Sequence, residues 1–305
     1  MTKAAAAAAL ACALAPALAH GQVVGGNVQK RANAVLAMMG YMLTPDVTTG
    51  SLAISNDTTG NPDFGMSTLG GGFTASGESP LYLEGTLGYG RYDPTFISSG
   101  GQVERLAAQW DAYSATGGIG WSFPLSAQLV LRPIFNFSYG RVESKVSASG
   151  QTATGEEIDF LRDGRLDTYG LGGSLVLDYE RDRPENTIDV ELRYTNIYLQ
   201  SFGGSSAAVK GSADAQSVSL WSRWRAPTGI TLLERPLRYV LEYAHTTFLG
   251  DLDGVLGFNH LSSVGAGLEL DSSARDIIVA RTRLMARYKF GDSVSGWAVG
   301  IAVSF

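Results

Sequence analysis

Hydrophobic and polar residues alternate one by one over long stretches of this chain. Residues 188–194 read IDVELRY, so four apolar side chains occupy one parity and three charged side chains occupy the other. Residues 131–139, 237–243 and 278–290 repeat the pattern. Because successive side chains of a β-strand point to opposite faces, this period of two predicts strands with one apolar face and one charged or small face.

Glycine, proline and short polar residues divide the alternating stretches into about twelve predicted strands. These lie near 47–55, 64–76, 80–94, 110–126, 129–146, 164–181, 186–202, 215–228, 237–250, 261–272, 277–292 and 294–305. Many span at least ~9–12 residues, longer than the ~5–6 typical of soluble sheets and suited to a tilted membrane crossing. Most links alternate between short turns and long polar loops, although the predicted link 226–236 is longer than this alternation expects.

Aromatic residues gather at the ends of the predicted strands, as they do at the two water interfaces of membrane barrels. They are Tyr89, Tyr92, Trp121, Phe123, Tyr139, Tyr169, Tyr179, Tyr194, Trp224 and Tyr288. Because backbone groups in lipid must pair with one another, a membrane-spanning sheet has to close on itself. The pattern therefore predicts an all-β fold, a transmembrane antiparallel β-barrel of about 12 strands over residues 47–305.

The N-terminus has the pattern of a secretory signal. Lys3 precedes the apolar stretch 4–18, and the small-residue motif ALA at 17–19 predicts cleavage before His20. The alternative is an ordinary alanine-rich helix. Cys12, the only cysteine of the chain, lies inside the predicted signal 1–19, so the exported protein is expected to have no disulfide. The formal charge of −6 argues against a nucleic-acid partner.

Residues 20–46 form a predicted N-terminal segment that contains one apolar stripe. In NVQKRANAVLAMMG, residues 27–40, apolar side chains recur at helical spacing after Asn27, a residue suited to cap a helix. The stripe consists of Val28, Ala32, Val35, Leu36 and Met39. One interpretation is a plug helix seated in the pore, and the other is a periplasmic tail or amphipathic piece without a role. The residues alone leave both open.

The polar faces of the predicted strands carry charges of both signs, which are expected to line the lumen. The pore-lining cations are Arg132, Arg223, Arg225, Arg281, Arg283, Arg287 and Lys289, and the anions are Glu84, Asp178, Glu180, Asp189, Glu191, Glu242 and Glu269. They could form a selective pore or a solute site. The balance of signs favours the other interpretation, a salt-bridged interior that satisfies itself.

One motif suggests catalysis. In GFNHLSS, residues 257–263, the pair His260 and Ser262 resembles the rim motif of outer-membrane phospholipase A and of lipid A deacylases. Their shared parity predicts that both side chains face lipid. A nucleophilic serine also needs a base that a third group orients, and the flanking outward residues His245, Thr247, Thr282 and Leu284 supply no carboxylate or amide. The alternative is an interfacial histidine beside loop serines.

No cofactor-binding or metal site is expected from the sequence. Histidines occur only at positions 20, 245 and 260, and no cysteine lies outside the predicted signal. The glycine-rich stretches 68–73 and 117–122 lack the lysine and the following helix that a phosphate-binding loop requires. These glycines are instead expected to relieve crowding on a curved wall.

The last ten residues, GWAVGIAVSF, resemble the C-terminal assembly signal of bacterial outer-membrane barrels. Gly300, Val303 and Phe305 match that signal, whereas Ala298 stands where a polar residue is usual. The resemblance implies insertion by the barrel-assembly machinery. Residues 40–305 are similar as a whole to solitary autotransporter β-barrels, which resemble a translocator barrel without its passenger. TPDVTTGSLAIS, PLYLEGTLGYGRYDP and VGAGLELD carry this likeness.

We therefore expect a non-enzymatic barrel of the bacterial outer membrane, with a structural role or the role of a narrow or plugged channel. The expected partners are outer-membrane lipid, lipopolysaccharide and, during biogenesis, the barrel-assembly machinery. An oligomeric state does not follow from the sequence. Two alternatives stay open: a lipid hydrolase that uses His260 and Ser262, and an adhesin or receptor that displays the loops 93–109, 147–163 and 203–214.

Overall fold

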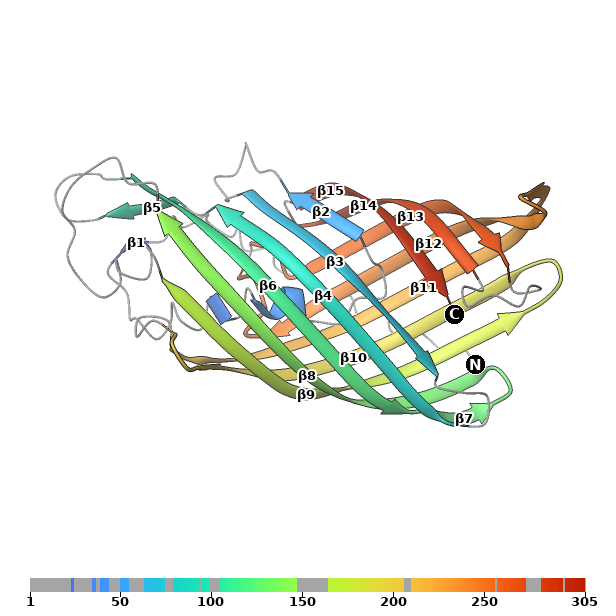
Figure 1. Ribbon diagram of the computed structural model, residues 1–305, viewed down its shortest axis with the longest axis horizontal. Coiled ribbons are helices and arrows are strands. Elements are labelled where there is room, and N and C mark those ends of the chain that lie inside the picture. Colours follow the sequence, from blue (N-terminus) through green and yellow to red (C-terminus); the bar gives the residue numbers. More distant parts are fainter. Residues whose placement is uncertain are drawn as a thin grey trace, which may run out of the picture.

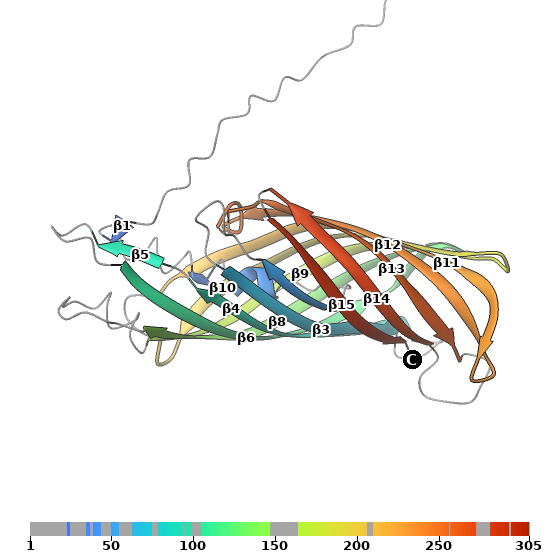
Figure 2. The ribbon, with the colours of Figure 1, turned by 90° about the horizontal axis from the view of Figure 1, so that it is seen from above.

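The computed structural model of the chain is a barrel formed by one curled antiparallel sheet (Figures 1 and 2). It describes residues 23–24, 35–36, 39–43, 50–54, 63–74, 79–93, 95–98, 105–146, 164–205, 210–255, 257–272, 281–292 and 294–304. The predicted signal 1–19, the proposed cap Asn27, the loop 147–163 and the terminal Phe305 lie outside these residues. Among the described residues, no helix is long and apolar enough to cross a membrane.

Twelve strands form the wall, each hydrogen-bonded to the next in the order of the chain. They are β2 (Gly50–Ile54), β3 (Asp63–Thr74), β4 (Leu81–Asp93), β6 (Arg105–Trp121), β8 (Leu129–Val146), β9 (Arg165–Asp182), β10 (Thr187–Phe202), β11 (Ser212–Leu232), β12 (Arg235–Gly250), β13 (His260–Asp271), β14 (Arg281–Gly291) and β15 (Val294–Ser304). The edge strands β2 and β15 lie side by side (Figure 1). The prediction of an all-β antiparallel barrel of about twelve strands is confirmed.

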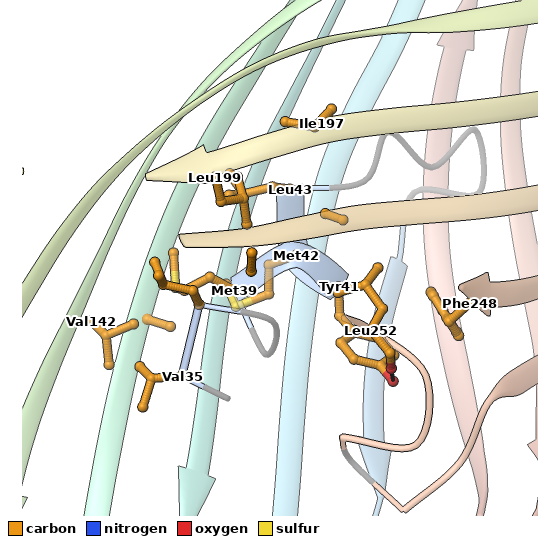
Figure 3. Close-up of a cluster of buried hydrophobic side chains, with 14 of the residues drawn as sticks. Val35, Met39, Tyr41, Met42, Leu43, Val142, Ile197, Leu199, Phe248 and Leu252 are labelled. Atoms are coloured by element: carbon orange, nitrogen blue, oxygen red, sulfur yellow. Dashed lines mark hydrogen bonds between the residues drawn. The ribbon is translucent and has the colours of Figure 1, made fainter. Parts of the chain in front are cut away.

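Three short strands lie off the main path of the wall. β7 (Phe123–Ser126) pairs with β8, and β5 (Thr95–Ser98) forms a small hairpin with β6. β1 (Val23–Val24) pairs in parallel with β5, so this part of the N-terminal segment lies at the same end of the barrel as β5 (Figure 2). Residues 35–36 and 39–43 are helical and lie inside the barrel (Figure 3).

The two ends of the barrel differ. The turn end carries the tight connections 127–128, 183–186 and 233–234, and β15 finishes there. The loop end carries β5 and the connection 251–259 between β12 and β13. This asymmetry is typical of outer-membrane barrels, whose short turns face the periplasm and whose longer loops face outward.

The connection between β11 and β12 differs from the sequence prediction. Residues 226–236 were expected to form a long link, but both strands continue through most of it to a two-residue turn at Leu233 and Glu234. Both residues have positive φ, 52° and 59°, as a type I′ hairpin turn requires. The register shifts between Pro227 and Thr231, so a bulge absorbs the Pro-Thr-Gly stretch that reads as a loop in the sequence.

Side chains alternate across the wall as the sequence pattern predicts. In β10 the side chains of Leu192 and Tyr194 are exposed, whereas those of Glu191 and Arg193 are buried. In β15, Trp297 is exposed and Ala298 is buried. A continuous outward band of large apolar side chains is what a lipid environment favours.

Two tyrosines mark the edge of the outward apolar band at the loop end. Tyr89 Oη donates to Asp111 at 3.0 Å and Tyr139 Oη donates to Asp167 at 3.1 Å, so each phenol meets a carboxylate on the next strand. At the other end of β6 stands the exposed Trp121. Trp121 follows Asp111 by ten positions, roughly 33 Å along a strand and about 23 Å along the axis of a barrel whose strands tilt ~45°. This spacing fits the ~25 Å apolar band of outer-membrane barrels.

Candidate functional site

The loop-end half of the lumen is filled by the helical residues 35–36 and 39–43. The described side chains on all sides of this helix are buried, with exposed fractions between 0% for Leu36 and 6% for Tyr41. They pack against inward-facing apolar residues of five strands, β6, β8, β9, β10 and β11, and against the loop end of β12 (Figure 3). The contacting wall residues are Trp110, Ala112, Val142, Leu166, Ile197, Leu199, Ala213, Ala215 and Phe248. The interior therefore has an apolar core at this level.

Polar contacts fix the end of the helix. Ser114 Oγ donates to the carbonyl of Met42 at 3.3 Å, and Thr116 Oγ1 donates to the carbonyl of Leu43 at 2.8 Å. The last carbonyls of a helix have no partner within it, so these two hydroxyls of β6 satisfy groups that would otherwise be buried without a hydrogen bond. The hydrogen bonds also fix the depth of the helix in the lumen.

The connection 251–259 folds over the helix and is held to it by Tyr41. The Tyr41 hydroxyl lies 2.5 Å from the carbonyl oxygen of Leu252 and 3.2 Å from that of Phe258, and its ring contacts the rings of Phe248 and Phe258. Leu252 is fully buried against the helix (Figure 3). Close approach requires glycine at Gly40, since a Cβ there would lie 2.5 Å from Leu252 Cδ2 and 2.9 Å from Ala215 Cβ.

Below the helix, toward the turn end, an ion pair crosses the lumen. Arg193 of β10 contacts both carboxylate oxygens of Glu84 on β4, at 2.6 and 3.1 Å, although three other strands separate β4 from β10 in the wall. Arg193 Nε also lies 3.1 Å from Glu191. Asn136 donates to Glu84 at 2.8 Å and accepts from Ser174 at 2.6 Å. Arg193 belongs to the charged parity of residues 188–194 but was absent from the predicted pore-lining set.

A second ionic group lies nearer the turn end, around the fully buried Glu269 of β13. Arg225 and Arg283 lie 3.4 and 2.6 Å from its carboxylate oxygens, and Arg238 lies 3.9 Å away. Arg225 also reaches Asp189 at 3.1 Å, which links β11 to β10. These pairs make the turn-end half of the lumen an ionic network.

The predicted pore-lining residues all lie on the inner parity of their strands. Beyond those already described, Arg132 pairs with Asp178, Arg223 with Asp189, Arg225 with Glu180, Arg287 with Glu242 and Arg281 with Asp271, while Lys289 is buried. The lumen thus contains paired charges of both signs. A pore or solute role for these residues stays a prediction.

Ser262 has a different partner from the predicted one. Ser262 Oγ lies 2.8 Å from Nδ1 of His245 on β12, and His260, two residues away on β13, instead lies 3.1 Å from Asp292 and 2.9 Å from Asn259 Oδ1. The two imidazole rings are 5.7 Å apart. The His-x-Ser pair of the sequence is therefore replaced by a cross-strand pair, because the register sets His245 directly opposite Ser262.

The carboxylates at the loop-end edge of the apolar band have shifted acidities. Burial of Asp167 opposes its ionisation, but hydrogen bonds from Arg165, Arg141 and Tyr139 outweigh this effect and lower the pKa of Asp167. Asp111 behaves alike, since burial is outweighed by hydrogen bonds from Gln109, Tyr89 and Lys145, and its pKa is also lowered. Both groups lie at the loop-end edge of the apolar band, and their hydrogen-bond and cationic partners favour the ionised carboxylates.

The other predicted sites are placed as follows. Gly300 is a buried residue of β15, Val303 belongs to the same strand, and Phe305 lies outside the described residues, so the assembly signal stays a prediction. Among the residues that the structure describes, no group of three or more His, Cys, Asp or Glu side chains is arranged to hold a metal ion.

Comparison with known proteins finds autotransporter β-domains that resemble this chain in sequence and in fold. The family described as Autotransporter beta-domain matches residues 19–166. The β-domain of the Bordetella autotransporter BrkA is 17% identical, with a TM-score of 0.51 over 84% of this chain and 97% of that one. The transport unit of the autotransporter AIDA-I from Escherichia coli is 12% identical, with a TM-score of 0.51 over 92% of this chain and all of the other. No curated protein matches the sequence.

Proposed function

We propose, from the match of residues 19–166 to the model of the autotransporter β-domain family, that the chain is an outer-membrane barrel that its own N-terminal helix keeps closed. In this proposal the signal 1–19 is removed on export, the barrel-assembly machinery inserts the chain, and outer-membrane lipid and lipopolysaccharide surround it. The turn end faces the periplasm and the loop end faces outward. The barrel has a structural role or serves as a narrow channel that opens only when the helix leaves.

The observation that carries this proposal is the complete burial of the helix. Leu36, Met39 and Leu43 are each 0% exposed inside the barrel, and the connection 251–259 covers the helix from above. Beneath it, the bidentate pair Arg193–Glu84 spans the lumen. An apolar plug and an ionic network thus lie in series along the barrel axis, and the proposal assigns the closure to the plug.

The hydrolase that the sequence suggested, with His260 as the base for Ser262, is not favoured, because the hydrogen-bond partner of Ser262 is His245. The adhesin or receptor alternative depends on loops of which 147–163 lies outside the described residues. The plugged barrel is therefore the function that the described contacts support best.

The test uses a reversible cross-link between the helix and the wall. Because a Cβ at Gly40 would lie 2.9 Å from Ala215 Cβ, cysteines at these two positions can form a disulfide after small shifts. With Cys12 replaced by serine, no other cysteine is present. We expect the oxidised Gly40→Cys/Ala215→Cys protein to be silent in planar bilayers, and a variant lacking residues 23–45 to conduct.

The Gly40→Cys single variant is the matched control, since it carries the same crowding without a cross-link. We expect it to open more often than the oxidised pair and to ignore the reductant. If the oxidised pair conducts as well as the variant lacking residues 23–45, the helix is not the barrier and the proposal is wrong.

A further inference from the structure

A polar notch interrupts the apolar outer face of the barrel near the loop end. His245 of β12 and Ser262 of β13 are directly opposite each other in the ladder, and Thr247 is opposite His260 in the same pair of strands. All four lie on the outward parity of these strands. Below them on the same face, Tyr243 is 40% exposed and Val264 is 47% exposed, as lipid-facing residues are. The notch, as we call these four polar side chains, therefore lies on the lipid-facing side of the wall near its loop-end edge, with Ser262 itself 7% exposed.

His245 has a hydroxyl partner at each ring nitrogen, and because a hydroxyl both donates and accepts, either neutral tautomer fits this geometry. Nδ1 lies 2.8 Å from Ser262 Oγ and Nε2 lies 3.2 Å from Thr247 Oγ1. In the neutral tautomer that carries its proton on Nε2, this N–H donates to Thr247, and Nδ1 accepts from the Ser262 hydroxyl. A serine hydroxyl that donates to a neutral imidazole is the ground-state arrangement of an activated nucleophile.

His260 and Asp292 support His245 from the side. The His260 ring lies 5.7 Å from the His245 ring, and its Nδ1 is 3.1 Å from Asp292 Oδ2 and 2.9 Å from Asn259 Oδ1. These two acceptors restrict rotation of the His260 ring, which in turn limits the space open to His245. His260 is thus a positioning residue here and not the base.

The lack of cationic side chains around the notch argues against a phosphate group as its ligand. Over the loop-end halves of β12, β13 and β14, none of the described outward side chains is a lysine or an arginine. A phosphate headgroup site would normally include such cations. What the notch offers instead is a nucleophile and a base, which suits the neutral carboxylic ester that joins an acyl chain to its lipid.

We propose that Ser262, activated by His245, is acylated by ester-linked lipids of the loop-end leaflet. Ser262 Oγ attacks the ester carbonyl carbon while its proton passes to His245 Nδ1. The bond from the carbonyl carbon to the alcohol oxygen then breaks, and His245 returns the proton to that oxygen. Water hydrolyses the acyl-serine in the same manner, with His245 as base and then acid.

The strand geometry also limits the rate of this reaction. Ser262 and its neighbours are in a continuous ladder with β12 and β14, so their backbone N–H groups are committed to strand pairing. The developing oxyanion therefore lacks backbone donors of the kind that elsewhere accelerate acyl transfer about 10²–10³-fold each. We expect slow turnover, which covalent trapping detects more readily than steady-state assays.

The experiment labels the refolded full-length chain in lipid vesicles with a fluorophosphonate probe. We expect the wild type to be labelled, Ser262→Ala to lose the label, and His245→Gln to be labelled about 10²–10⁴-fold more slowly, the usual worth of a general base. His260→Gln should slow labelling less than His245→Gln does. The matched control is Ser263→Ala, the next residue in the chain, which is as buried as Ser262 but lies on the inner parity and should leave labelling unchanged.

Two further measurements keep the test decisive. Thr247→Val leaves the His245 ring in place but removes the partner of Nε2, so it should slow labelling even if His245→Gln fails to fold, and heat-modifiable gel mobility reports folding of each variant. Fatty-acid release is then measured from vesicles of diacylglycerophospholipid alone and from vesicles that also contain lipopolysaccharide.

The proposal is supported if either kind of vesicle releases fatty acid with the wild type and not with Ser262→Ala. The vesicle composition that gives release identifies the source of the ester. Three results each overturn the proposal. These are an unlabelled wild type, labelling that persists in Ser262→Ala, and labelling without fatty-acid release in either arm.

Discussion

The ion pair that crosses the lumen gives a quantitative prediction. Among the described contacts, Arg193 is the only cation paired with Glu84, and it also pairs with Glu191. The side chains of all three residues are at most 11% exposed. Arg193→Met therefore leaves two buried carboxylates without their cation. Breaking a buried pair from one side costs about 3–5 kcal/mol, and we expect the free energy of unfolding to fall by that amount.

Glu84→Gln should cost less than Arg193→Met, because Arg193 then keeps Glu191 and the new amide oxygen still accepts from Asn136. A loss of about 1.5–3 kcal/mol is expected, the range for one hydrogen bond made with a charged group. The double variant should be more stable than the sum of the two losses predicts, because Glu191 alone is then left unpaired.

The measurement is urea unfolding of the barrel in detergent micelles, followed by tryptophan fluorescence and by gel mobility. Lys145→Met is the control, because Lys145 pairs with Asp111 through a side chain that is 65% exposed, and exposed pairs contribute at most about 1 kcal/mol. A loss below 1 kcal/mol for Arg193→Met, or no coupling in the double variant, would refute the cross-lumen pair.

Three further predictions follow from other parts of the barrel. Leu36→Ala removes a fully buried plug side chain at a cost of about 2–5 kcal/mol, so bilayer openings should become at least ~30-fold more frequent, whereas unchanged recordings would contradict the packing. Leu233→Asn together with Glu234→Gly should raise the unfolding free energy by about 1 kcal/mol, measured by urea unfolding, because both positions have positive φ. The lowered pKa of Asp167 means that its contribution to stability is complete above about pH 4 and is lost as pH falls through the lowered value. Proteolysis of the loop end should therefore accelerate at pH 3 in the wild type, and Asp167→Asn should be equally susceptible at pH 3 and pH 6.

Strand positions could be predicted closely because lipid and lumen impose opposite chemistry on alternate residues. β8 begins and ends where the alternation placed it, at Leu129 and Val146. The exception is the hairpin of β11 and β12. Neither Leu233 nor Glu234 is a residue that normally marks a type I′ turn, and Gly229, which reads as the turn, lies in the bulge region.

The sequence could predict a candidate site only where its residues lie close together in the chain or on adjacent strands. His245 was recognised as flanking Ser262, but its role depends on the facing register and on the hydrogen bond that the ring makes. The pair Arg193–Glu84 joins strands that are not adjacent, and periodicity carries no information about distances across a lumen. The helix likewise buries Tyr41, Met42 and Leu43 beyond the predicted stripe, because walls surround it on all sides.

The path of the N-terminal segment constrains the order of assembly. β1 pairs with β5 at the loop end, the helix follows inside the barrel, and β2 joins the wall at Gly50, opposite Thr68 in the middle of β3. If the wall closed first, by bringing β2 against β15, β1 and the helix would still have to enter the barrel. They would then have to pass the Arg193–Glu84 bridge to reach an interior already filled by side chains. Seating of the helix and sealing of the β2–β15 seam are therefore expected to be coupled steps, and a bulky group attached near Val23 should slow maturation of the barrel without lowering the stability it finally reaches.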